Sequence, residues 1–147
     1  MKKITFIIAF FTIILTSSCS KDDGPSRETI TYTLHAVANP NIQGTVKFSE
    51  NEDGTATVVL AINGSSTDIH PAYIYNGDEN GTGSIAITLL PIECACESST
   101  TLVSKLDNGT GITFKGLKAL NGHVKIHQSS SEMGTIIAQG NIGANAK

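Results

Sequence analysis

The segment TITYTLHA, at residues 29–36, decides the fold class of this chain. Its apolar side chains occupy every second position, and these positions are Ile30, Tyr32, Leu34 and Ala36. Threonine or histidine stands between them. Because successive side chains of a β-strand point to opposite faces, this alternation predicts a strand with one buried face and one exposed face.

The same two-residue period recurs along the chain, at residues 45–48, 57–62, 84–89, 123–127 and 134–142. In one of these segments, Ile85, Ile87 and Leu89 would share a buried face. Asn-Gly and Asp-Gly pairs lie between the segments and favour tight hairpin turns, because both residues accept positive φ. About eight short strands at this spacing predict an all-β sandwich or barrel. Residues 113–120 do not alternate and predict a short helical turn under one end of the sandwich.

The composition is that of one folded domain. The chain has 147 residues, of which 39% are apolar and 16% are charged. This length fits a single domain, and the apolar content is too high for a disordered tail. Three cysteines are too few for a disulfide-stapled miniprotein. The net charge of −3 excludes an electrostatic nucleic-acid binder, which needs a basic face.

The N-terminus predicts export from the cytoplasm. Lys2 and Lys3 precede the apolar stretch Ile4–Leu15, and small residues follow it. This pattern is typical of a secretory signal, and the stretch is shorter than the roughly 18 residues that span a bilayer. The signal ends on Cys19 and resembles a bacterial lipoprotein box, although Thr16 stands where leucine is usual. We therefore expect residues 1–18 to be a lipoprotein signal peptide and Cys19 to carry the lipid; secretion with an incidental cysteine is the alternative.

Residues 19–28 are polar and predict a flexible tether between the lipid and the folded domain. Within it, Lys21-Asp22-Asp23 resembles the surface-export signal of Bacteroidetes lipoproteins. That resemblance implies a lipid anchor in the bacterial outer membrane and favours exposure of the domain at the cell surface. The sequence does not otherwise decide which face of the membrane carries the anchor. Cleavage before Cys19 removes two lysines and no acids, which leaves eight basic and 13 acidic residues and a net charge of −5. Attachment to the membrane would therefore come from acyl chains rather than from the protein surface.

Several motifs resemble the chordin-type (CHRD) domain family. His70-Pro71-Ala72-Tyr73-Ile74-Tyr75 is similar to the family's His-Pro-Ala-His-Ile-His motif, and the segments 42–46, 106–110, 121–127 and 137–143 follow in the family's order. The resemblance spans residues 30–143, so we expect residues 29–147 to form a CHRD-like domain. It implies a Greek-key antiparallel β-sandwich that is related in shape to Cu/Zn superoxide dismutase.

The chain departs from that family where metal-bearing relatives place their ligands. In those relatives a His-x-His strand binds the ion, but the matching residues here are Tyr73 and Tyr75. A neutral phenol is a poor ligand near pH 7, because its unperturbed pKa is about 10. His127 matches the later histidine of the family, and His70 precedes the strand and could swing toward the site. His123 would lie about 13 Å from His127 on one strand, too far to share an ion comfortably.

These substitutions favour a binding or structural module over an enzyme. The chain has four histidines, which cannot supply the larger ligand set of a dismutase. The expected ligand surface is the end of the sandwich that carries His70, Tyr73, Tyr75 and His127, with a glycan or a protein as its partner. Two tyrosines on one strand face offer a large contact area with polar groups, or they are half-buried structural residues. The alternative function is a copper or zinc protein that is related to the dismutases and has a degenerate histidine site.

Cys94 and Cys96 flank Ala95 in a predicted loop. Outside the cytoplasm, thiols tend to be oxidised, so we expect a disulfide between them, although the ring would be small and strained. A clip for Cu(I) or Zn and pairing with another molecule are the alternatives.

Overall fold

The computed structural model describes residues 27–65, 68–93 and 97–146. The predicted signal peptide, the lipidation site Cys19 and most of the predicted tether lie outside the described residues, as do Cys94 and Cys96. The lipid anchor and the disulfide therefore stay predictions. No helix in the described ranges is long and apolar enough to cross a membrane.

Eight strands and one short helix make up the domain, which confirms the predicted all-β class. They are β1 (Thr29–Ala36), β2 (Gln43–Glu50), β3 (Ala56–Asn63), β4 (His70–Asn76), β5 (Ile85–Ile92), β6 (Ser98–Val103), α1 (Phe114–Lys118), β7 (Asn121–His127) and β8 (Ile136–Gly143). All strand pairs are antiparallel.

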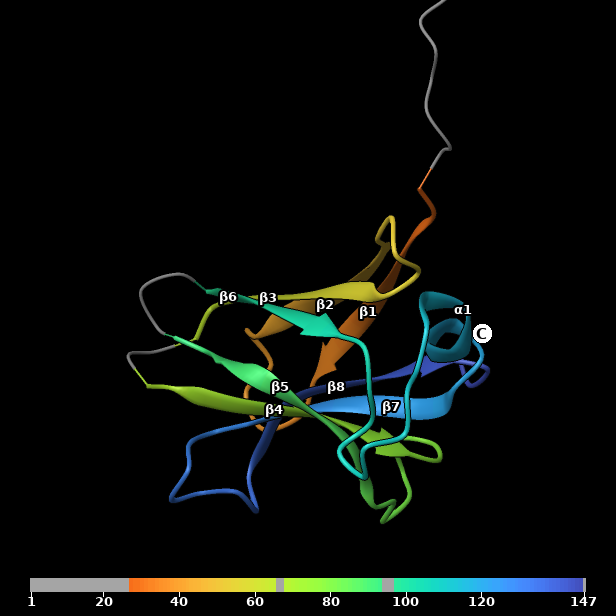
Figure 1. Ribbon diagram of the computed structural model, residues 1–147. Helices are drawn as coiled ribbons and strands as arrows, with labels where there is room; N and C mark the ends of the chain where they lie inside the picture. The colour runs from red at the N-terminus through yellow and green to blue at the C-terminus, as the bar shows by residue number, and fades with distance from the viewer. Residues whose placement is uncertain (1–26, 66–67, 94–96, 147) are drawn as a thin grey trace, which may run out of the picture.

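The strands form two layers that share β1 (Figure 1). Their order is β5-β4-β7-β8-β1-β2-β3-β6. The first six residues of β1 pair with β2, and its last two, His35 and Ala36, pair with β8. After β5 and β6, the chain returns through β7 to lie beside β4, which is the Greek-key connection. The predicted Greek-key β-sandwich is therefore the observed fold.

Side chains close the other side of the sandwich, where β5 and β6 come together without a main-chain ladder. The N–H of Leu90 on β5 donates to Oγ1 of Thr101 on β6 at 2.9 Å. The carboxylate of Asp107 accepts from the N–H of Thr88 at 3.0 Å and from its hydroxyl at 2.7 Å. The eight strands consequently form a nearly closed barrel.

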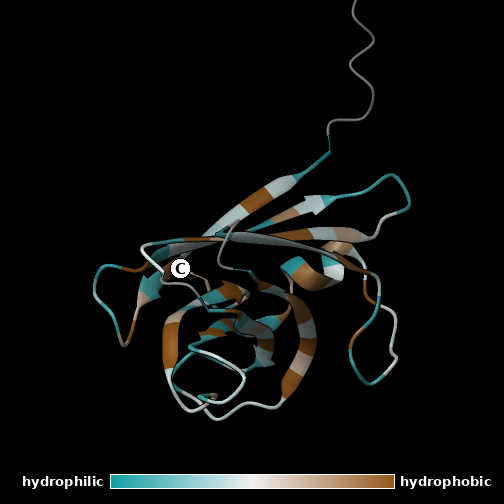
Figure 2. Cartoon of the chain, turned by 90° about the vertical axis from the view of Figure 1, so that its left-hand side faces the viewer, coloured by the Kyte–Doolittle hydropathy of each residue, from teal (hydrophilic) through white to brown (hydrophobic). Residues whose placement is uncertain are grey.

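The alternating apolar residues meet between the layers. Leu34, Phe48 and Ile126 are fully buried there, and Figure 2 shows apolar and polar residues alternating along the strands. The predicted shared face of Ile85 and Ile87 is wrong, because Ile85 is 43% exposed whereas Ile87 is buried. A register shift where β4 pairs with the start of β5 turns Ile85 outward.

The predicted helical turn is α1, and it covers one end of the core. The hydroxyl of Thr113 accepts the N–H of Gly116 at 3.2 Å and caps the helix. Phe114 and Leu117 are fully buried and lie against the sandwich, where α1 contacts β2 and β8. The N-terminal end of β1 lies at this same end of the sandwich (Figure 1).

Candidate functional site

Five polar and aromatic side chains gather on the outer face of β4 and β7. We call them the tyrosine–histidine cluster: Tyr73, Tyr75, His123, Lys125 and His127. Strand alternation points them away from the core, and Tyr75 lies opposite His123 while Tyr73 lies opposite Lys125. The sequence placed both tyrosines on one face, and the pairing of β4 with β7 brings His127 to them.

The rings of the cluster are in continuous contact. Tyr75 stacks on His123 with ring centroids 5.3 Å apart and planes 11° from parallel. Tyr73 meets Tyr75 edge-on at 6.0 Å and His127 edge-on at 5.7 Å. Nζ of Lys125 lies 5.5 Å from the centre of the Tyr75 ring, close enough for a cation–π contact. The cluster is therefore a packed layer and not a set of separate surface residues.

His127 has a partner at each ring nitrogen. Its Nδ1–H donates to the carbonyl of Met133 at 2.6 Å, so its Nε2 accepts the hydroxyl proton of Tyr75 at 3.0 Å. Burial lowers the pKa of His127, and the charge of Lys125 lowers it further. Burial also raises the pKa of the Tyr75 phenol, with a smaller contribution from Tyr73. The pair is therefore a neutral imidazole that accepts from a neutral phenol.

His123 is fully buried although it lies on the outer face. Its Nδ1–H donates to the carbonyl of Gly77 at 2.8 Å, and its Nε2 has no hydrogen-bond partner in the described ranges. Lys125 donates to the carbonyl of Gly81 at 3.3 Å in the same loop. Burial lowers the pKa of His123. The β4–β5 loop and the β7–β8 loop thus cover the two ends of the cluster (Figure 1).

His70 does not join the cluster, although it was expected on the same surface as Tyr73, Tyr75 and His127. His70 is the first residue of β4, and its side chain lies on the same inward-pointing face as that of Ala72. It is only 1% exposed. Residues an odd number of positions apart on a strand point to opposite faces, which separates His70 from both tyrosines. Its Nδ1–H donates to the carbonyl of Gln128 at 2.7 Å.

The described residues do not fit the metal centre that the family resemblance implies. Among them, no three histidine, cysteine, aspartate or glutamate side chains are grouped so that they could hold an ion. The Tyr75 hydroxyl occupies the Nε2 lone pair of His127, which an ion would need. His70 and His123 point to opposite faces of the layer that contains β4 and β7. No chemical step through a metal is therefore derived from this cluster.

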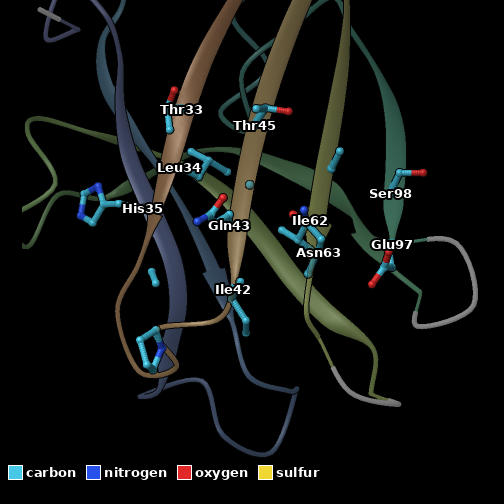
Figure 3. A pocket seen from close by; sticks show the side chains of 14 residues that line it. Thr33, Leu34, His35, Ile42, Gln43, Thr45, Ile62, Asn63, Glu97 and Ser98 are labelled. Carbon is cyan, nitrogen blue, oxygen red and sulfur yellow. The ribbon is translucent and has the colours of Figure 1, made fainter.

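A groove lies elsewhere, at the end of β1, β2 and β3 where β6 begins (Figure 3). This groove has a volume of about 870 Å³. Its polar lining residues are Thr33, His35, Gln43, Thr45, Asn63, Glu97 and Ser98. The sequence analysis missed this groove, because its residues come from four strands whose pairing is not visible in a linear pattern. Outward-facing threonines and amides near strand ends were the only signal.

Comparison with protein-family models, with curated proteins and with solved structures found no match for this chain. The site is therefore interpreted from its own residues. The cluster is a structural layer with Tyr73 half-buried at the surface, and the groove is an open polar concavity.

Proposed function

We propose that this protein is a lipid-anchored module of the bacterial outer membrane, with a CHRD-like sandwich that binds a partner in the cell envelope and performs no catalysis. The bond from Tyr75 to His127 is the observation that supports this proposal. A general base or a metal-binding histidine needs an Nε2 lone pair that a substrate or an ion can reach. The phenol occupies that lone pair, so the cluster stabilises the fold at the position where metal-bearing relatives hold their ion.

The chain upstream of β1 supports the proposed anchor. The apolar stretch Ile4–Leu15 ends just before Cys19, and β1 begins ten residues after that cysteine, at Thr29. A tether of this length lets a folded domain lie next to the bilayer without inserting into it. The mature charge of −5 gives the domain no attraction of its own to anionic lipids.

A degenerate copper or zinc site is the second candidate, and one feature of His70 favours it. The Nε2 atom of His70 is buried without a partner in the described ranges, while its Nδ1–H is held by a main-chain carbonyl. Metal-bound imidazoles are commonly oriented in this way. One imidazole does not make a stable site, so this candidate needs further donors.

Cell fractionation tests the anchor, and elemental analysis tests the metal. Wild type should enter the membrane fraction and incorporate labelled palmitate, while Cys19→Ser should lose both properties. Cys94→Ser is the matched control and should stay in the membrane. Purified wild type should contain neither copper nor zinc in stoichiometric amount after growth with both metals. Stoichiometric metal that is lost in His70→Ala, or turnover of superoxide, would refute the non-enzymatic proposal.

A further inference from the structure

We infer that the groove at the end of β1, β2 and β3 binds an uncharged oligosaccharide about three sugar rings long. The inference deepens the proposed function, because it names the ligand class of the binding module. It rests on the arrangement of the groove's side chains, on their lack of internal partners, on their charge and on the closed strand pairing beneath them.

Hydroxyl groups form a row across the groove, perpendicular to the strands. In register, Thr33 on β1 lies opposite Thr45 on β2, and Thr45 lies opposite Ala61 on β3. Ala61 lies opposite Ser98 on β6. Neighbouring strands are about 4.8 Å apart, so the row spans about 14 Å over three steps. One step is close to the length of one ring in an oligosaccharide, and small Ala61 leaves the middle of the row open.

A pair of amides lies beside this row. Gln43 on β2 is the register partner of Asn63 on β3, one outward position beyond Thr45 and Ala61. Each amide offers both donors and acceptors, as sugar hydroxyls do. Figure 3 shows the hydroxyl and amide side chains along neighbouring strands around the groove. The hydroxyl row and the amide pair could therefore hydrogen-bond to two edges of one sugar chain.

These polar groups are available to a ligand. Among the described residues, the side chains of Thr33, Gln43, Thr45, Asn63 and Ser98 have no hydrogen-bond partner, and all five residues are exposed. Some hydroxyls elsewhere in the sandwich are occupied, as those of Thr57, Thr88 and Thr101 are. A hydrogen bond to a ligand in the groove would therefore replace only a bond to water.

The charge of the groove selects a neutral ligand. Among the described residues that line it, none is a lysine or an arginine, and Glu97 is the one carboxylate. His35 already lies 3.7 Å from the carboxylate of Glu79. Sulfated or uronic-acid polymers would meet this carboxylate on an expected mature chain of net charge −5, without a lysine or arginine of the described lining to bind them.

Strand pairing disfavours a peptide in this groove. Extended peptides commonly bind by adding a strand to a free sheet edge. Here β1 lies between β8 and β2, β2 lies between β1 and β3, and β3 lies between β2 and β6. At the middle of the groove, the main chain of Thr45 and Ala61 is therefore paired on both sides, so recognition there must come from side chains, which suits a sugar.

The groove also faces away from the proposed anchor. The chain enters β1 at Thr29, and the groove begins four residues later at Thr33. At about 3.3 Å per residue, this separation is about 13 Å along the strand. The backbone of Glu97 is strained at the rim, with φ of 48°, and its carbonyl accepts the N–H of Ile62 at 2.8 Å. Such a strained and fixed rim is typical of a preformed binding site.

A glycan array with the full-length protein in detergent tests this inference. The array carries uncharged hexose and N-acetylhexosamine oligomers of two to six units, beside sulfated and uronic-acid oligomers of equal length. Calorimetry then measures the affinity for the best oligomer. We expect binding to uncharged oligomers, with an affinity that rises up to about three units and then levels off. The double variant Gln43→Ala, Asn63→Ala should weaken binding at least about tenfold.

Two control variants separate the groove from the rest of the surface. Thr100→Ala changes an exposed threonine of the same layer outside the groove lining and should bind like wild type. No binding to any uncharged oligomer, or binding to charged oligomers only, would overturn the inference, whereas the anchor and metal experiments would still decide the proposed function. Binding that is lost in Tyr73→Ala but kept in the double variant would also overturn it and would move the ligand to the tyrosine–histidine cluster.

Discussion

Replacement of Tyr75 by phenylalanine tests whether the tyrosine–histidine cluster stabilises the fold. The variant keeps the ring that stacks on His123 and removes only the hydroxyl that donates to Nε2 of His127 at 3.0 Å. His127 is 5% exposed, so water cannot easily replace the lost donor. Nε2 would then be a buried acceptor without a partner.

The expected loss of stability is about 1–2 kcal/mol. A buried polar group that loses its partner costs about 1–3 kcal/mol. The lower part of that range applies here, because the half-buried Tyr75 no longer has to bury its own hydroxyl in the folded state. For a domain of this size, such a loss lowers Tm by about 3–8 °C.

Urea unfolding followed by far-UV circular dichroism at pH 7.5 measures this loss. Tyr73→Phe is the matched control, because the Tyr73 ring packs in the same cluster while its hydroxyl has no hydrogen-bond partner among the described residues. The control should stay within about 0.5 kcal/mol of wild type, and the m-value should not change in either variant. Equal losses in Tyr75→Phe and Tyr73→Phe would refute the role of the phenol–imidazole bond.

Two further predictions concern pH and close packing. The folded-state pKa values of His123 and His127 are lowered below their unfolded value of about 6.5, so the unfolded chain binds more protons below that pH. The free energy of unfolding should therefore reach its highest value above pH 6.5. It should fall as the pH is lowered below 6.5, by up to about 1.4 kcal/mol per histidine and pH unit. Thermal melts between pH 7.5 and 5.5 measure this, and a constant Tm would contradict it. Gly140→Ala should cost about 1–3 kcal/mol in urea unfolding, because a Cβ there would lie 2.4 Å from the main-chain oxygen of Thr33. Gly134→Ala, where a Cβ meets nothing within 4 Å, should be nearly neutral, and equal effects would contradict the packing argument.

The local patterns of the chain were sufficient for the fold class. Strand β1 has the buried and exposed faces that its alternation predicts, and α1 begins at a capping threonine, Thr113. Both features depend on residues within a few positions of each other. The prediction was wrong at Ile85, because the register shift between β4 and β5 involves two segments and leaves no mark on the alternation of either one.

The candidate site could be predicted only in part. The spacing of Tyr73 and Tyr75 places both on one strand face, and strand alternation alone already separates them from His70. The partners of these residues come from distant segments. Met133 and Gly77 lie in loops that fold over the outer face and bury His127 and His123 there, and no periodicity predicts a buried residue on an outward face.

The amino-acid sequence by itself determined where most of the strands form, where the short helix starts and which predicted signal precedes the domain, because these depend on neighbouring residues. It did not predict strand β6, at Ser98–Val103. Only the tertiary structure decided which outward side chains are buried, and that hydroxyls of three strands align in one row with Ala61 between them. The physical reason is that strand order and register follow from contacts between segments tens of residues apart. Burial and convergence of side chains depend on those contacts and not on the local period.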